Sequence, residues 1–496
     1  MRIAALALAL LASGCASLGS MQSAHLASDS QVLRDCAQWY RELDARVDAA
    51  GVRDAQEARI AGYPYLRVNR LLASFRGEAA ASRPALHDLV ERMHELDLLA
   101  RRREAANLLS IDNDPALRDL FGERMVTQRA SGCGAILRDA DLTEPAALAA
   151  LLERAVVPDD YSTLSRVLGF YALSKIPFAA GVRRHEEETR TAFAREPAVP
   201  AGGNVVRYAP PSAPPLPRAL LATMIEHAAV NPLRIPEPRD SELETLFAAY
   251  APSFEVEITG DHDRFGALRW LRDAPMPSVD AADLAVYRHL AWTRYRGRVL
   301  LQLVYSIWFP ERPPLSDGDI LAGKLDGITW RVTLAPDGEP LVYDVMHPCG
   351  CYHMFFPTPR AVPLPVPEGE TEWMFSPQAL PRIAEGERPV LRIATRTHHL
   401  ERISVVRGAD SVVRYELRPY DELRSIQRLD GRRSSVFGQD GLIAGSERLE
   451  RFLFWPMGIP SAGAMRQWGR HATAFVGRRH FDDPDLIEKR FELRLR

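Results

Sequence analysis

The stretch from Trp330 to Val345 reads WRVTLAPDGEPLVYDV and contains two short apolar runs on either side of a turn. Apolar side chains alternate with other residues at Trp330, Val332 and Leu334, and alternate again at Leu341, Tyr343 and Val345. Between the runs, Pro336, Asp337 and Gly338 supply the residue types that favour a tight turn. A period of two on each side of such a turn predicts a β-hairpin with one face buried.

Further strands are expected around this hairpin. Residues 287–295 and 299–309 flank Gly297 and suit a second hairpin, and shorter strands are predicted at 390–395, 403–406 and 412–417. Because no long helical pattern separates these runs, they predict an antiparallel sheet in the C-terminal half of the chain.

The N-terminal half has a different period. From Asp29 to about Arg195, apolar residues recur at the three-and-four spacing of a helix face. The three clearest stripes are Leu86, Leu89, Val90, Met93 and Leu96; Leu148, Leu151 and Leu152 after the cap Thr143; and Leu164, Val167, Leu168 and Tyr171. We therefore expect an all-helical N-terminal domain before an antiparallel-sheet α+β domain, which makes the fold class α+β.

The length of the chain also favours two domains. A single core stops growing at roughly 250 to 300 residues, and this chain has 496. Seven prolines between Pro197 and Pro217 cannot continue a helix and predict a linker. The predicted domains are a helical domain at 29–196, a proline-rich linker at 197–240 and an antiparallel α+β domain at 241–496.

Composition and charge exclude two classes of protein. With 46% hydrophobic and 26% charged residues, the chain has the composition of a folded globular protein and not of a disordered polymer. The net charge is only −3, and acidic residues dilute the arginines throughout. Nucleic-acid affinity depends largely on a concentrated positive charge, so we expect no nucleic-acid partner.

The N-terminus has the layout of an export signal. Arg2 precedes an apolar run from Ile3 to Ala12, and Ser13 and Gly14 lead to Cys15. The run is too short to span a bilayer, so residues 1–14 are predicted to be a signal peptide.

The segment from Leu11 to Cys15 resembles the lipobox of bacterial lipoproteins, although the family prefers Leu where this chain has Ala12. The resemblance implies that Cys15 is acylated, that 15–28 is a tether, and that Ala16 directs the protein to the outer membrane, facing the periplasm. The membrane is then one partner, through the N-terminal lipid, and an envelope protein or the cell wall is another candidate. The alternative is cleavage after Ala16, which would release a soluble periplasmic protein.

The densest group of reactive side chains follows the hairpin that opens this section. His347, Cys349, Cys351 and His353 fall within seven residues, and imidazole and thiolate are ligands that zinc and copper select. In an extended strand they would be spread too widely for one ion, but Gly350 can adopt a positive φ and fold Cys349 back towards Cys351. Distant histidines would then complete the site, and the candidates are His398, His399, His471 and His480.

Two other interpretations of this segment remain open. In an oxidising compartment, Cys349 and Cys351 are expected to bond to each other or to the other cysteines, and a disulfide between Cys36 and Cys133 is favoured in the helical half. Alternatively, one thiol is a nucleophile beside His347 or His353, with Asp344 orienting the base.

These observations lead to two functional hypotheses. The first is a binding or assembly role in the cell envelope, with zinc or copper as the candidate cofactor at His347 to His353. The second is a periplasmic hydrolase or transferase that depends on a thiol or a metal. A binding protein should present a groove without a converged acid, base and nucleophile, whereas an enzyme should bring these groups within hydrogen-bond reach.

Overall fold

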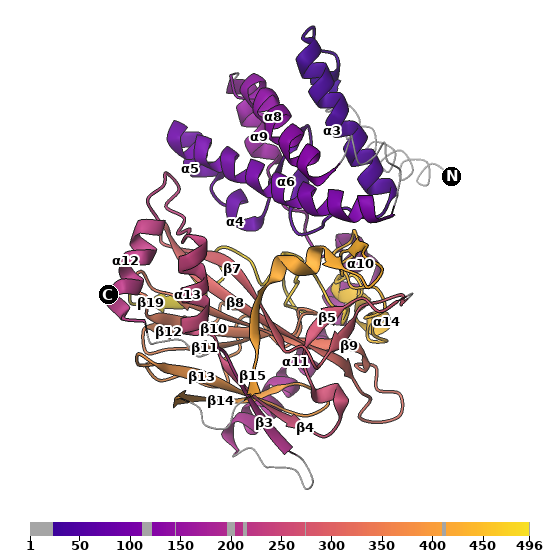
Figure 1. The fold of residues 1–496 in the computed structure, drawn as a ribbon. Coiled ribbons are helices and arrows are strands. Elements are labelled where there is room, and N and C mark those ends of the chain that lie inside the picture. Colours follow the sequence, from indigo (N-terminus) through magenta and orange to yellow (C-terminus); the bar gives the residue numbers. More distant parts are fainter. Residues whose placement is uncertain are drawn as a thin grey trace. The chain divides into compact units, whose positions relative to one another are not determined.

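The computed structural model describes residues 23–111, 122–143, 145–195, 204–211, 216–272, 274–408 and 413–495. The predicted signal peptide, the lipobox and Cys15 lie outside these ranges. The chain is α+β, as its sequence predicts, and its contacts divide it into two units (Figure 1). The helical unit comprises Met1–Pro158 and Gly431–Gln439, and the sheet unit comprises Asp159–Asp430 and Asp440–Arg496.

The helical unit is built around the long helix α6 (Arg83–Ile111), which buries Leu89, Val90 and Met93 from its predicted stripe. A disulfide joins Cys36 on α3 to Cys133 on α8, the pair that the sequence favoured. The other elements of this unit are α2 (Ser23–Leu26), α3 (Gln31–Ala49), β1 (Ala58–Ile60), β2 (Tyr63–Val68), α4 (Arg70–Ala73), α5 (Arg76–Ala81), α8 (Glu123–Asp141), α9 (Pro145–Arg154) and β18 (Arg433–Ser434). The domain is therefore not entirely helical, because β1 and β2 form a small antiparallel sheet.

Two sheets organise the sheet unit. The larger has the strand order β11-β10-β9-β8-β7-β16, and its strands are β7 (Ala285–Tyr295), β8 (Arg298–Arg312), β9 (Gly323–Leu334), β10 (Pro340–Met346), β11 (Met354–Pro357) and β16 (Glu416–Pro419). The smaller has the order β14-β13-β4-β3-β15, and its strands are β3 (Asn204–Ala209), β4 (Ser253–Ile258), β13 (Glu387–Ile393), β14 (Leu400–Arg407) and β15 (Val413–Arg414).

The remaining elements of the sheet unit are short, apart from three helices. The three longer helices are α11 (Tyr171–Ala194), α12 (Arg218–Ala228) and α13 (Asp240–Tyr250). The short elements are α10 (Thr163–Leu168), η1 (Asp261–Asp263), β5 (Ala267–Arg269), β6 (Ser278–Asp280), β12 (Ala361–Pro363), η2 (Tyr420–Arg424), β17 (Ile426–Gln427), α14 (Arg451–Phe454), η3 (Trp455–Met457) and β19 (Phe491–Leu493). Among the residues described, no helix has both the length and the apolar character needed to cross a bilayer.

Both predicted hairpins are confirmed. β9 pairs antiparallel with β10, and β7 pairs antiparallel with β8. At the tip of the β7–β8 hairpin, Arg296 and Gly297 have φ values of 47° and 74°, which is the positive-φ pair that a two-residue hairpin turn requires. The sheets are mixed and not purely antiparallel, however, because β4 and β13, β3 and β15, and β7 and β16 pair in parallel.

One apolar core lies between the two sheets. Trp330 and Tyr305 from the larger sheet share it with Phe254 and Leu391 from the smaller. On the other side of the larger sheet, a second core includes Leu341 and the C-terminal Phe491. The central strands are thus buried on both faces, which explains why β8 reads as a nearly continuous apolar run.

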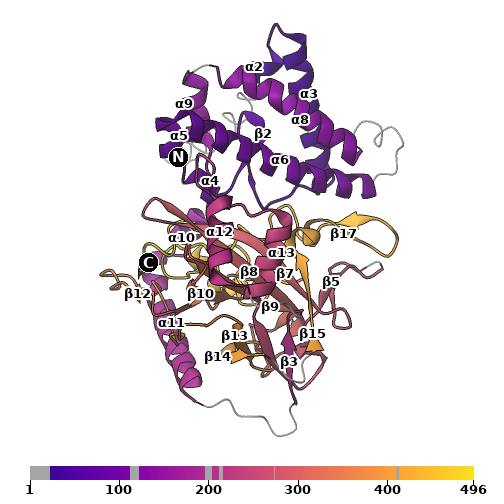
Figure 2. The ribbon, with the colours of Figure 1, turned by 60° about the vertical axis from the view of Figure 1, so that its left-hand side comes forward.

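The structure corrects the predicted domain boundaries in two places. The proline-rich segment is not simply a linker, because it contains β3, a strand of the smaller sheet in which Tyr208 is buried. The helices α10 and α11, predicted for the helical domain, belong to the sheet unit, where α11 contacts β14 (Figure 2). Helical periodicity indicates that a helix forms but not which core it joins.

Candidate functional site

The residues from His347 to His353 form the connection between β10 and β11. Gly350 donates a backbone hydrogen bond to the carbonyl of His347 at 2.8 Å, and His347 donates one to the carbonyl of Cys351 at 3.0 Å. Gly350 has a φ of +90°, as expected, and a Cβ at this position would lie 2.3 Å from the carbonyl oxygen of Ala472. Only glycine therefore allows this tight turn.

The two thiols of this turn are not joined to each other. Cys349 and Cys351 both carry free thiols, which corrects the expectation of a disulfide at this segment. Cys349 is buried, and a hydrogen bond from Cys351 lowers its pKa against the opposing effect of burial. The same hydrogen bond and burial raise the pKa of Cys351 well above its usual value. Cys351 is therefore held as the protonated thiol.

His353 is hydrogen-bonded to Asp344, the residue that the sequence predicted would orient a base. His353 Nε2 lies 2.9 Å from Asp344 Oδ2, and Arg331 donates to both oxygens of the same carboxylate, at 2.9 and 2.5 Å. The arginine keeps Asp344 ionised, so Nε2 carries the proton and Nδ1 is an acceptor. No described residue donates a hydrogen bond to this buried Nδ1, and burial lowers the pKa of His353 to about 3.

His347 belongs to a different network, centred on the buried carboxylate of Asp326. His347 Nδ1 lies 3.0 Å from Asp326 Oδ1, and His398 Nδ1 lies 2.9 Å from Asp326 Oδ2. Arg448 approaches the same carboxylate at 3.3 Å, and these partners hold the pKa of Asp326 well below its usual range. Leu325, beside the carboxylate, and His398 both have positive φ, at 59° and 52°. Non-glycine residues in this conformation mark a segment held in place by its surroundings.

Of the other predicted ligands, His399 lies near His347, with ring centroids 5.8 Å apart, whereas His471 and His480 have partners elsewhere. His399 Nε2 lies 3.3 Å from Arg312 Nη1, His471 packs beside the main chain of Pro348, and His480 lies 3.4 Å from both Asp159 and Asp483. Within the described ranges, no three His, Cys, Asp or Glu side chains are placed to hold a metal ion. His347 lies against Asp326 and His353 against Asp344, so the two histidines of the predicted cluster are held by different carboxylates.

A cavity of about 490 Å³ opens beside this turn. Its walls come from α11, from the β10–β11 connection and from the C-terminal segment. The apolar lining includes Pro177, Phe178, Val182, Phe375, Phe454 and Phe475, and the polar lining includes His185, Glu186, Cys351, Tyr352, His353, Glu372, Glu450 and Arg479. The rings of Phe178 and Phe475 lie 5.1 and 5.0 Å from that of Phe454. Aromatic walls with a few polar groups are typical of a small-molecule site.

Two of the polar groups are used by the protein itself. Glu372 accepts hydrogen bonds from the backbone of Phe475 and Val476, at 2.7 and 2.9 Å. Arg479 donates to Thr473 and to the carbonyls of Glu372 and Trp373. The hydrogen-bonding groups of Glu372 and Arg479 therefore have partners within the protein in the absence of a ligand.

The electrostatics of the cavity favour uncharged groups. Burial raises the pKa of Glu450 to about 7, and it also raises the pKa values of Glu186 and Glu372. Burial lowers the pKa of His185, so this imidazole is also kept neutral. The carboxyl of Glu450 packs against Gly463, where a Cβ would lie 2.0 Å from Glu450 Oε1. A dry, apolar wall around these groups explains why their neutral forms are favoured.

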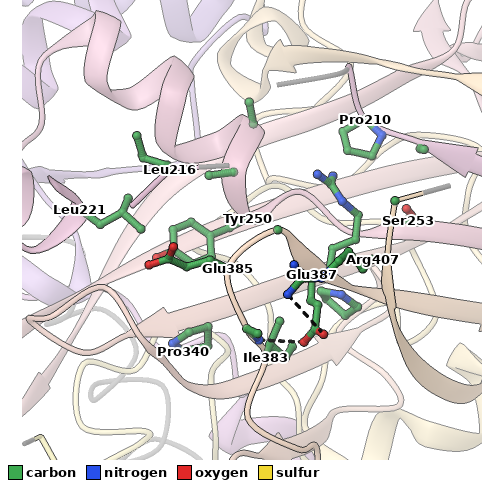
Figure 3. Close-up of a pocket in the computed structure, with 18 of the residues that line it drawn as sticks. Pro210, Leu216, Leu221, Tyr250, Ser253, Pro340, Ile383, Glu385, Glu387 and Arg407 are labelled. Carbon is green, nitrogen blue, oxygen red and sulfur yellow. Dashed lines mark hydrogen bonds and ion pairs between the residues drawn. The ribbon is translucent and has the colours of Figure 1, made fainter. Parts of the chain in front are cut away.

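A second cavity, of about 460 Å³, lies at the end of the smaller sheet and is drawn in Figure 3. Tyr250, Ser253 and Arg407 line it together with Glu385 and Glu387 (Figure 3). Three of its arginines already have partners: Arg218 donates to the carbonyls of Gly338 and Ile383, Arg388 to that of Ala251, and Arg414 to that of Pro210. These arginines stabilise the loops that close the sheet, so this cavity is the weaker candidate.

Several residues of the site were not predicted from the sequence. Arg331 stood in the quoted hairpin, and the register that pairs it with Asp344 follows from the turn at Gly338. Glu450, His185 and Asp326 come from distant parts of the chain, and no local pattern connects them to Cys351. No family model, curated protein or solved structure matches this chain.

Proposed function

We propose that the sheet unit binds an uncharged, largely apolar small molecule in the cavity beside Cys351. The observation that carries the proposal is the combination of aromatic walls with titratable groups whose neutral forms burial favours, Glu450 and His185. Apolar and aromatic walls with a few uncharged hydrogen-bonding groups favour a ligand of the same character.

The charge state of the lining supports an uncharged ligand. Arg479 is the cation in this wall, and its donors are bound to the protein. Burial keeps His185 neutral and raises the pKa of Glu450 to about 7, so below that pH both groups offer hydrogen bonds without a full charge. An anionic ligand would enter this site without a free cation to pair with, at a large cost in desolvation.

The enzyme hypothesis has less support from the geometry. A thiol nucleophile needs a base on its proton, but His353 Nδ1 makes no described hydrogen bond, and so none to Cys351. Hydrogen bonding with Cys349 and burial also raise the pKa of Cys351, which keeps it in the less reactive thiol form. We therefore favour a binding role, and we propose from the lipobox resemblance that the protein acts at the outer membrane.

Filling the cavity should test this proposal. Gly181 lines the cavity on α11, and a Cβ built there meets no described atom within 4 Å. Gly181→Leu should therefore direct its side chain into free space and occupy part of the site. Titration with N-phenyl-naphthylamine, an uncharged dye that fluoresces in apolar surroundings, should show saturable binding by the wild type and roughly tenfold weaker binding by this variant.

Gly132→Leu is the matched control. Gly132 is also an exposed helical glycine with free space around its Cβ, but it lies on α8 of the helical unit. Both substitutions should stabilise their helices by about 1 kcal/mol, so a loss of folding would not explain lost binding. Equal dye binding by wild type, Gly181→Leu and Gly132→Leu would contradict the proposal.

A further inference from the structure

The sheet unit exposes an unusual concentration of apolar side chains in two short segments. Ten large apolar residues there are between 43% and 74% exposed. They are Leu164, Val167, Leu168, Phe170, Leu173 and Ile176 from α10 and α11, and Leu449, Phe452, Leu453 and Trp455 from the region of α14. We call these ten residues the apolar patch. Soluble monomers commonly expose single apolar residues, but a contiguous group of this size marks an interaction surface.

The two segments lie side by side. α10, α11 and α14 all contact η3. At the end of α10, a Cβ on Gly169 would lie 2.5 Å from Pro456 Cβ, so this glycine lets the helix pack directly against the segment that follows α14. The rings of Phe178 on α11 and Phe454 on α14 are 5.1 Å apart. The patch is therefore one surface and not two.

Phe170 is unusual in this surface, because its side chain is exposed and its backbone has a positive φ. Its side chain is 74% exposed, and its backbone has a φ of +47°, the left-handed region that non-glycine residues avoid. Neither burial nor backbone conformation in the isolated protein explains a phenylalanine here. A role in contact with a partner does.

The two segments that carry the patch are basic over most of their length, although Glu450 lies between Leu449 and Arg451, and Glu186, Glu187 and Glu188 follow Arg184. From Tyr161 to His185 the sequence contains Arg166, Lys175, Arg183 and Arg184 and no acidic residue, and from Arg451 to Phe481 it again contains arginines and no acidic residue. Lys175, Arg183 and Arg184 are exposed. The guanidinium of Arg451 lies over the ring of Phe452, at 4.8 Å from its centroid.

We infer that the apolar patch docks onto the surface of a bilayer that contains anionic lipid. Exposed Trp, Phe and Leu side chains with basic residues at their margin are the composition of helices that lie in a membrane interface. The patch also continues into the proposed binding cavity, because α11 and α14 contribute Phe178 and Phe454 to its wall. A protein partner would need acidic complementarity, whereas a lipid surface supplies both acyl chains and negative charge.

Vesicle flotation tests the inference directly. The full chain with Cys15→Ala, which removes the predicted acyl anchor, should bind vesicles made of equal parts phosphatidylcholine and phosphatidylglycerol. Replacing Leu168, Leu173 and Phe452 by Gln should weaken this binding by roughly tenfold or more. The control replaces Val230, Leu271 and Leu429 by Gln, because these residues are exposed apolar residues of the sheet unit outside the patch, and its binding should change less than about twofold.

A charge variant separates the two components of binding. Replacing Lys175, Arg183 and Arg184 by Gln should reduce binding to the anionic vesicles and its dependence on salt, and leave binding to pure phosphatidylcholine unchanged. Brominated acyl chains should quench tryptophan fluorescence on binding, and Trp455→Phe should remove much of that quenching while the vesicles remain bound.

Three results would overturn the inference. The first is that the chain does not bind vesicles, and the second is that the patch variant binds as well as the control. The third is that the chain self-associates in sedimentation and that the patch substitutions disperse it, since the surface would then join two copies of the protein. Gly181→Leu should retain vesicle binding, so failure of the cavity proposal and failure of this one can be told apart.

Discussion

Helix α6 of the helical unit and the α10–α11 segment of the sheet unit carry the same sequence pattern and have opposite environments. In α6, Leu89, Val90 and Met93 recur at the helical spacing and are fully buried. In the other segment, Leu164 and Leu168 recur at the same spacing and are more than 60% exposed. The contrast shows that a periodic apolar stripe predicts a helix with an apolar face, but not that the same chain covers that face.

The difference lies in what each helix packs against. α6 contacts β2, α8 and α3, which cover its stripe from several directions. α10 and the start of α11 contact each other and η3, and the described residues leave the outer side of their stripe open. The helix also breaks at Gly169 and Phe170, so the single stripe predicted from Leu164 to Tyr171 spans two helices.

The sharpest test of this comparison is one substitution made in both stripes. Leu89→Ala should destabilise the helical unit by about 3 kcal/mol, because it leaves a cavity in a packed core. Leu168→Ala should change the stability of the sheet unit by less than about 0.5 kcal/mol, because the side chain is already largely in water. Urea unfolding of the full chain, followed by circular dichroism, measures both effects.

Equal destabilisation by the two substitutions would break the comparison. It would show that residues outside the described ranges, or a second copy of the chain, cover the stripe at Leu168. A concentration series would then distinguish these two explanations, because only a second copy makes the stability depend on protein concentration.

The sequence predicted local structure where turn chemistry is explicit. Asp337 with Gly338, and Arg296 with Gly297, marked both hairpins, and Gly350 marked the turn that brings Cys349 near Cys351. The pairing of Asp344 with His353 could also be predicted, because the two residues are nine positions apart across a short β-connection. In each case the interacting groups are close in sequence, so the local pattern carries the information.

Apart from the Cys36–Cys133 disulfide, features that depend on distant segments were missed. β3 contains Val205 and Val206, but the prolines on either side of it led to the prediction of a linker. Its pairing with β4 could not be predicted from local sequence, because the paired residues are about fifty positions apart. The buried carboxylate of Asp326 gathers His347, His398 and Arg448 from three separate segments. The described residues do not bring the predicted metal ligands together, for the same reason: His347 and His353 are close in sequence, but His347 lies against Asp326 and His353 against Asp344.

A second prediction concerns the pH dependence of the cavity, which the exposed patch should not share. The pKa of Glu450 is raised to about 7 mainly by burial, with Asp326 and Asp319 adding to the shift and Arg448 and Arg312 opposing it. If the apolar dye binds only while this carboxyl is protonated, its affinity should fall by up to about tenfold per pH unit above that pKa. Glu450→Gln should remove this dependence, and a dye titration at several pH values would show it.

The raised pKa of Glu450 also determines whether its contribution to folding stability rises or falls with pH. The folded pKa of about 7 lies above the usual 4.5, so the folded protein holds a proton that the unfolded chain releases between these values. The stability contributed by protonated Glu450 is complete below about pH 4.5 and is lost as the pH rises to about 7. Glu450→Gln should therefore gain stability relative to the wild type as the pH rises from about 4.5 to about 7, and a difference between the two proteins that stays constant over this range would contradict the raised pKa.

The smallest expected effect lies at Phe170 and bears most directly on why the two stripes differ. Phe170→Gly should stabilise the sheet unit by about 1 kcal/mol, because glycine adopts a φ of +47° without the steric cost that phenylalanine carries. Ile176→Gly is the matched control, since Ile176 is also an exposed patch residue but has ordinary helical geometry, and there glycine should destabilise by about 1 kcal/mol. Both variants should bind anionic vesicles less well than the wild type. If thermal unfolding shows that Phe170→Gly is stabilised and Ile176→Gly destabilised, while both bind vesicles less well, then Phe170 is retained for contact with the membrane at the expense of stability. If Phe170→Gly is instead destabilised, its side chain has a structural partner in the sheet unit.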